Sequence, residues 1–198
     1  MPKKSLIPIV EGQSEVESAG VLLRRILYAK DTYDVEVARP FRVKRNKVVR
    51  RGELEKAIRQ AELSRGGAAA ILVVLDADDD CPADLGPALE ARAKAATELP
   101  VALVLAEIEF EAWLLGAKES LRGVRGIADD AVAPSNPQRI RDAKGELSDN
   151  MIDGRRYIAV DDQPALVQEM DIELASERCS SFARFVRSVN TLLTEMAD

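Results

Sequence analysis

The sequence predicts an α/β fold in which helices flank a parallel β-sheet. Three apolar runs have the length of buried strands, at residues 6–10, 69–75 and 101–106, and a shorter alternating run lies at 35–37. Helical patterns separate these runs, which gives the order β-α-β-α-β-α-β of a doubly wound sheet. Acidic residues directly follow three of the runs, at the sheet edge where such folds bind ligands.

The first half of the chain supplies two strand–helix units. The strand at 6–10 contains Pro8, which has no N–H to donate within a sheet. The first helix is predicted to begin at Ser14, because Ser14 and Glu17 have the spacing of a capping box. A second helix is predicted where apolar residues repeat at helical intervals over 54–61, and it is expected to end near Gly66-Gly67.

The second half of the chain is predicted to be mostly helical. An alanine-rich helix follows Pro82 and runs to about Glu98, and residues 123–136 have the composition of a loop. The last helix has one apolar face, formed by Phe182, Phe185, Val186, Val189, Leu192, Leu193 and Met196. Without an internal repeat or a low-complexity linker, we expect a single domain, with a core over about 1–122 and a helical extension over about 137–198.

The composition excludes several function classes. The 198 residues include no histidine, which excludes Ser-His-Asp and Cys-His catalysis and histidine-ligated zinc. Cys81 and Cys179 lack the spacing of a metal or redox motif, which favours free thiols in a reducing compartment. No apolar run is long enough to cross a bilayer, and the first residues do not resemble a signal peptide. We therefore expect a cytoplasmic protein with no membrane partner.

Carboxylates at the strand ends are the candidates for metal binding. The acids that follow the first, third and fourth predicted strands are Glu11; Asp76 and Asp78; and Glu107, Glu109 and Glu111. Oxygen ligands of this kind suit Mg²⁺ or Mn²⁺, and the carboxyl ends of parallel strands meet at one edge of the sheet. The alternative is structural, because carboxylates at strand ends also cap the next helix or face solvent.

A basic stripe, residues 39–51, is the candidate for binding nucleic acid. It has seven basic residues and no acid, in a chain whose net charge is −6. Lysine and arginine contacts to phosphates give affinity that does not depend on sequence. The candidate contacts in the stripe are Arg42, Lys44, Arg45 and Lys47. The alternative is a solvated loop or hairpin, and Phe41 is the only aromatic residue of the stripe.

Several motifs resemble a known family. Glu11-Gly12, followed at a distance by Asp76-x-Asp78, is similar to the TOPRIM signature of topoisomerases, primases, a small ribosomal-RNA maturase and OLD-type nucleases. The match extends over most of the chain to a bacterial TOPRIM-like family, related to the OLD-type nucleases, that is one of the domains of unknown function. The segments that carry the match are residues 10–15, 76–80, 109–113, 161–164 and 181–182.

The resemblance implies a Rossmann-like TOPRIM sheet and a metal-dependent nuclease acting on DNA or RNA. Glu11, Asp76 and Asp78 would be the catalytic residues, with Glu11 acting also as a general base or acid. The implied ligands of Mg²⁺ or Mn²⁺ are Glu11, Asp76, Asp78, Glu109 and Glu111. Lys144 would stabilise charge on the nucleic acid. Genes of the family often lie near those of AAA-type ATPases, which implies an ATPase partner and a role in phage defence.

Two other functions stay open at this point. A non-catalytic subunit would keep the fold and bind a partner protein, and a buried Asp76 paired with an arginine would favour it. An acidic-pocket phosphotransfer domain fits less well, because a receiver domain carries its paired acids after the first strand and no strand end here supplies a lysine. The sequence leaves open whether the chain is an enzyme, and it is compatible with a homodimer.

Overall fold

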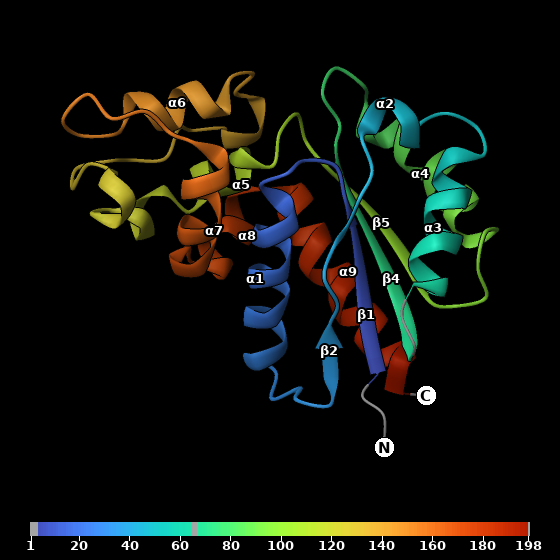
Figure 1. The fold of residues 1–198 in the computed structure, drawn as a ribbon. Coiled ribbons are helices and arrows are strands. Elements are labelled where there is room, and N and C mark those ends of the chain that lie inside the picture. Colours follow the sequence, from blue (N-terminus) through green and yellow to red (C-terminus); the bar gives the residue numbers. More distant parts are fainter. Residues whose placement is uncertain (1–3, 65–66, 198) are drawn as a thin grey trace.

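The computed structural model describes residues 4–64 and 67–197 and contains a five-stranded parallel sheet between layers of helices (Figure 1). The strands are β1 (Lys4–Val10), β2 (Val35–Val37), β3 (Phe41–Arg42), β4 (Ala68–Asp76) and β5 (Val101–Ala106). β1 and β4 lie in the centre, β5 forms one edge, and β2 and β3 follow one another along the other side of β1. The predicted α/β fold is confirmed, although the sequence did not predict β3.

Both faces of the sheet are covered by helices. α1 (Glu15–Tyr28) and α9 (Ser180–Ala197) lie on one face, and α3 (Glu53–Leu63) and α4 (Pro82–Lys94) lie on the other (Figure 1). Alternate side chains of β4 enter the two apolar layers, with Leu72 on the α1 and α9 side and Ile71 on the α3 and α4 side. Burial on both faces explains why β4 has an uninterrupted apolar sequence.

The remaining helices extend the fold beyond the carboxyl edge of the sheet and along α1. They are α2 (Arg45–Val48), α5 (Glu111–Gly116), α6 (Ala143–Asp149), α7 (Ala159–Glu169) and α8 (Ile172–Arg178), with short 3₁₀ turns between α5 and α6. Arg25 of α1 donates to the carbonyl oxygens of Val167 and Met170 at 2.6 and 2.8 Å, which fixes α7 against α1. The predicted helical C-terminal part is confirmed, and α6 lies beside the carboxyl edge (Figure 1).

Pro8 lies in the central strand β1, and its nitrogen faces the side of β1 where a missing hydrogen bond costs little. Leu6 and Val10 accept from Ala38 and Val43 of the neighbouring edge segment, at 2.9 and 2.8 Å. Pro8 lies between them with the same two-residue period, so its nitrogen faces the interruption between β2 and β3. The proline is therefore compatible with a central strand, because the edge has no strand at that position.

Three helix boundaries differ from the sequence predictions. α3 ends at Leu63, before the predicted end near Gly66-Gly67, of which Gly66 lies outside the described residues. α1 begins at Glu15, and Ser14 makes no side-chain capping hydrogen bond, so the predicted capping box is wrong. α4 ends at Lys94 rather than near Glu98, because the chain turns at Thr97, whose hydroxyl accepts from the Leu99 N–H at 3.1 Å. Within the described part of the chain, no helix is both long and apolar enough to cross a membrane.

Trp113 joins α5 to α9 through one buried hydrogen bond. Its ring is fully buried against Phe182 and Phe185, and its Nε1 donates to the Ser181 hydroxyl at 2.9 Å. The Ser181 hydroxyl in turn donates to Gln138 Oε1 at 2.6 Å. Ser181, in the first turn of α9, thus links α5 to the short 3₁₀ turn that contains Gln138.

Ser181→Ala is expected to lower the free energy of unfolding by about 1–3 kcal/mol, because it leaves the buried Trp113 N–H without an acceptor. Thr191→Ala, which removes an exposed hydroxyl from the same helix, is the matched control and is expected to cost less than about 0.5 kcal/mol. Chemical denaturation of both variants checks the difference. Equal losses would show that the Trp113–Ser181 bond contributes nothing specific.

Candidate functional site

The predicted site residues lie at the carboxyl edge of the sheet. Glu11 follows β1, Asp76 ends β4, and Glu109 and Glu111 follow β5. The central strands β1 and β4 are hydrogen-bonded neighbours, and β4 pairs with β5 up to Asp76, so their ends meet. In Figure 1 this edge lies at the top, between α6 and α2.

Asp76 is the central carboxylate of the site. Its Oδ1 accepts from the backbone N–H of Phe110 at 2.9 Å, which ties the end of β4 to the start of α5. Burial, followed by the negative charges of three neighbouring glutamates, raises the pKa of Asp76 well above its ordinary value. These glutamates are Glu15, Glu111 and Glu11. Carboxylates from the ends of β1, β4 and β5 therefore repel one another at this point.

Glu11 and Glu15 form the β1 side of the site. The Glu15 carboxylate accepts from the backbone N–H groups of Glu11 and Gly12 at 3.2 and 2.9 Å, and a side chain at Gly12 would collide with it. Glu11 Oε2 is buried and has no hydrogen-bond partner among the described residues. Burial and the charges of Glu15 and Asp78 raise the pKa of Glu11, against an opposing effect of Arg45.

Asp78 lies in the loop after β4 and contacts Arg45. Asp78 has a φ of 51°, in the left-handed region, and its side chain is 53% exposed. Arg45 Nη1 lies 3.4 Å from Asp78 Oδ2, and the same guanidinium donates to the carbonyl oxygens of Asp76 and Ala77, both at 2.8 Å. Arg45 also pairs with Asp80. The guanidinium thus binds the acidic loop itself.

Arg45→Met is expected to lower the free energy of unfolding by about 2–4 kcal/mol, because it leaves two backbone carbonyls without their charged donor. The Arg45 side chain is only 16% exposed, so water replaces these bonds incompletely. Arg51→Met, at an exposed position of the same basic stripe, is the control for denaturation measurements. An equal effect of the two substitutions would show that the contacts of Arg45 with the Asp76 and Ala77 carbonyl oxygens do not stabilise the fold.

Lys144 holds the acids that follow β5. Its Nζ donates to Glu109 at 2.6 Å and to Glu111 at 2.9 Å, and it comes from α6, far away in the sequence. The Glu111 side chain is 2% exposed, and its other oxygen accepts from Tyr157 and Gln163 at 3.2 and 3.0 Å. Burial lowers the pKa of Lys144, but the two carboxylates outweigh burial and raise it above its ordinary value.

The acids therefore fall into a central group and two outer groups. One outer group is Asp78, which contacts Arg45, and the other is Glu109 and Glu111, which contact Lys144. Among residues 4–64 and 67–197, no three acidic or cysteine side chains are arranged as a metal-binding group. Glu11 and Asp76 remain in the centre with no ion-pair partner among the same residues.

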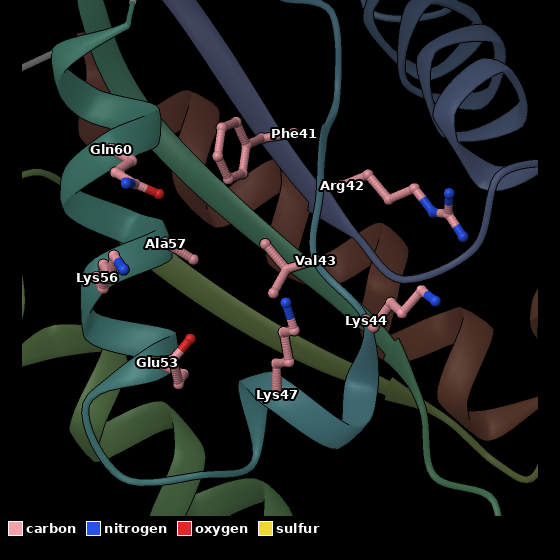
Figure 2. Close-up of a pocket in the computed structure, with 9 residues that line it drawn as sticks. All are labelled: Phe41, Arg42, Val43, Lys44, Lys47, Glu53, Lys56, Ala57 and Gln60. Carbon is pink, nitrogen blue, oxygen red and sulfur yellow. The ribbon is translucent and has the colours of Figure 1, made fainter.

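The basic stripe is neither a hairpin nor an open loop, because it contains β3, which runs parallel to β1, and α2. Arg42 donates to the Glu11 carbonyl oxygen and to Gln13, each at 3.1 Å. Behind it, β3, α2 and α3 enclose a groove of about 390 Å³, whose lining includes Lys44, Lys47 and Lys56 (Figure 2). Predicted nucleic-acid contacts thus lie both beside the acids and in the groove.

The sequence did not predict several residues of the site. Glu15 has the position of an ordinary first-turn acid of α1, although it belongs to the segment 10–15 that carried the family resemblance and contacts the backbone of Glu11 only four residues away. Gln163 belongs to the segment 161–164 that carried the family resemblance, which was an available signal. Tyr157 and Lys56 had none, because nothing in their local sequence indicates contact with the site or the groove.

Comparisons with known proteins identify a family but no function. No curated protein and no solved structure matches the chain. One family model, described as Domain of unknown function (DUF4276), matches residues 10–190. The match includes Glu11, the acids after β4 and β5, the basic stripe and Lys144, and it extends through most of α9. The chain therefore belongs to the DUF4276 family of domains of unknown function.

Proposed function

We propose that the chain is a TOPRIM-type phosphodiesterase that cleaves nucleic acid with the help of a divalent metal ion, Mg²⁺ or Mn²⁺. The observation that carries the proposal is the central group of carboxylates from β1, β4 and α1, which has a raised pKa at three positions. Such repulsion destabilises the ionised protein unless a cation is bound. Oxygen ligands of this kind suit a hard divalent ion.

The carboxylates can supply the ligands of such an ion after a rearrangement, since the described side chains do not form a metal-binding group as they stand. Glu11 Oε2 is buried without a hydrogen-bond partner among the described residues, so one ligand oxygen is free. Asp76 keeps one oxygen on the Phe110 N–H, which orients its carboxylate. Asp78 joins the set when it leaves its 3.4 Å contact with Arg45. We assign Glu109 and Glu111 to Lys144, which already supplies a positive charge there.

The protein residues around these ligands would position the substrate. The bound metal ion would supply polarisation of the scissile phosphate and a more acidic water. Glu11 would accept a proton from that water, because burial and its acidic neighbours raise the pKa of its carboxyl above its ordinary value. Lys144 would face the phosphate as a fixed cation. The TOPRIM resemblance extends this proposal to an AAA-type ATPase partner in phage defence.

Calorimetric titration of Mn²⁺ into the wild type and into Glu11→Gln tests the proposal, with a cleavage assay on plasmid and single-stranded substrates alongside. Glu11→Gln is expected to lose metal binding and cleavage together. Glu36→Gln removes an exposed carboxylate from β2 and is the control. A wild type that binds no metal would overturn the metal site. Metal binding without cleavage would favour the alternative of a non-catalytic subunit that binds a partner protein.

A further inference from the structure

We propose that the groove between α3 and the β3–α2 segment binds single-stranded nucleic acid, with a base against Phe41 and backbone phosphates on Lys47 and Lys56. This inference rests on the proposed function, because both take nucleic acid as the ligand. The groove would hold the part of the strand that lies next to the acidic site. Lys56 is outside the basic stripe. The groove therefore adds a second element, α3, to the predicted nucleic-acid surface.

The charges in the groove favour an anion. Lys44, Lys47 and Lys56 line it, and none of them forms an ion pair with an acid of the described residues. Glu53 is the one acid among the described residues that line the groove. The whole chain has a net charge of −6, so a polyanion must be attracted by a local patch of this kind.

The side chains approach the groove from two elements. Figure 2 shows Lys47 pointing from α2 into the space that faces α3, where Glu53, Lys56 and Gln60 lie along that helix. A ligand must therefore enter between the two elements to touch both lysines. A volume of about 390 Å³ suits one nucleotide. A double helix, whose major groove alone is about 12 Å wide, cannot enter a space of this size.

Phe41 and Gln60 supply contacts for a base. The Phe41 ring stands at one end of the groove, half-buried, and the Gln60 side chain extends toward it from α3 (Figure 2). Stacking of bases on aromatic rings beside a basic track is the usual way in which proteins bind single strands. A glutamine amide can both donate to and accept from a base edge.

The groove is connected to the acidic site through β3. Arg42 follows Phe41 and donates to the Glu11 carbonyl oxygen at 3.1 Å. Arg42 and Lys44 also line the groove, although their side chains point away from α3 in Figure 2. A strand bound at Glu11 can therefore run over Arg42 and Lys44 before it reaches Lys47 and Lys56.

Fluorescence anisotropy with a short labelled oligothymidylate and with a matched duplex tests the groove. Metal is removed with EDTA, so that cleavage does not interfere. The double variant Lys47→Glu/Lys56→Glu is expected to weaken single-strand binding at least about tenfold at low salt and to reduce the salt dependence. The double variant Lys30→Glu/Lys94→Glu makes the same charge change away from the groove and is expected to bind like the wild type.

Two further variants separate stacking from charge. Phe41→Leu, which keeps an apolar side chain, is expected to weaken binding roughly fivefold or more without changing the salt dependence. Glu53→Gln, which removes a negative charge from the lining of the groove, is expected to strengthen binding. Circular dichroism checks that each variant is folded.

Equal affinities of Lys47→Glu/Lys56→Glu and its charge-matched control would overturn the proposal that the groove binds single strands. Tighter binding of the duplex than of the single strand would also overturn it. Absence of wild-type binding to either would overturn it as well. The proposed function fails separately, through loss of metal binding or of cleavage in a protein that still binds the single strand through Lys47 and Lys56.

Discussion

Asp76→Asn is expected to abolish divalent-metal binding while raising the unfolding temperature of the metal-free protein at neutral pH. The amide keeps an oxygen that accepts from the Phe110 N–H, so the link between β4 and α5 is preserved. It removes the negative charge that burial and three glutamates oppose. A loss of about 100-fold or more in metal affinity is expected, since even changes outside the ligand shell cost roughly 10–100-fold.

Calorimetry and thermal unfolding measure the two effects on the same samples. Cleavage by Asp76→Asn is expected to fall by about 100-fold or more, which corresponds to about 2.7 kcal/mol of activation free energy. Asp84→Asn, at an exposed acid in the first turn of α4, is the matched control and should change neither quantity. A variant that is less stable than the wild type without metal would contradict the repulsion described for this site.

The pH dependence of stability follows from the same raised pKa values. Asp76, Glu11 and Glu15 have folded-state pKa values above their ordinary values of 3.8, 4.5 and 4.5. The folded state then binds more protons than the unfolded state at a pH above these ordinary values, so stability falls as the pH rises through the raised pKa values. The metal-free protein should unfold at a higher temperature at about pH 5 than at about pH 8.

A divalent ion should reverse this order, because metal ligands must be deprotonated. We therefore expect added Mn²⁺ to raise the unfolding temperature more at about pH 8 than at about pH 5. Asp76→Asn should flatten the pH dependence of the metal-free protein. A wild-type protein whose stability rises steadily over this pH interval would contradict the pKa directions.

Lys144→Met is expected to lower the free energy of unfolding by about 1–3 kcal/mol, because the buried Glu111 carboxylate loses its cation. The Lys144 side chain is 48% exposed, so water and salt replace part of the lost interaction, and the loss stays below that of a fully buried pair. Tyr157 and Gln163 still donate to Glu111 and limit the effect. Chemical denaturation measures the change.

The same variant should respond more strongly to metal than the wild type does. Without Lys144, the oxygens of Glu109 and Glu111 become available to a divalent ion, and added Mn²⁺ should restore part of the lost stability. Lys94→Met removes an exposed lysine that pairs with Glu90 at 2.7 Å, and it should cost less than about 0.5 kcal/mol with or without metal. Identical responses of the two variants would show that Lys144 does not neutralise a buried carboxylate.

The sequence by itself determined the sheet and the edge at which the acids lie. Apolar runs such as 69–75 are long enough for a strand and apolar on both faces, which is possible only between two layers of helices. Parallel connections then place every strand end at the same edge, so Glu11, Asp76 and Glu111 had to meet there. Periodicity and chain order contain this information, and neither depends on distant contacts.

Only the tertiary structure decided which charges neutralise one another. Lys144 reaches Glu109 and Glu111 from a helix more than thirty residues away along the chain, and Arg45 reaches the loop after β4 across a similar separation. Local sequence patterns report helix and strand periods but not which distant side chains meet. Three features therefore follow from packing alone: the pairing of the outer acids, the lack of an ion-pair partner for Glu11 and Asp76 among the described residues, and the groove shared by α2 and α3.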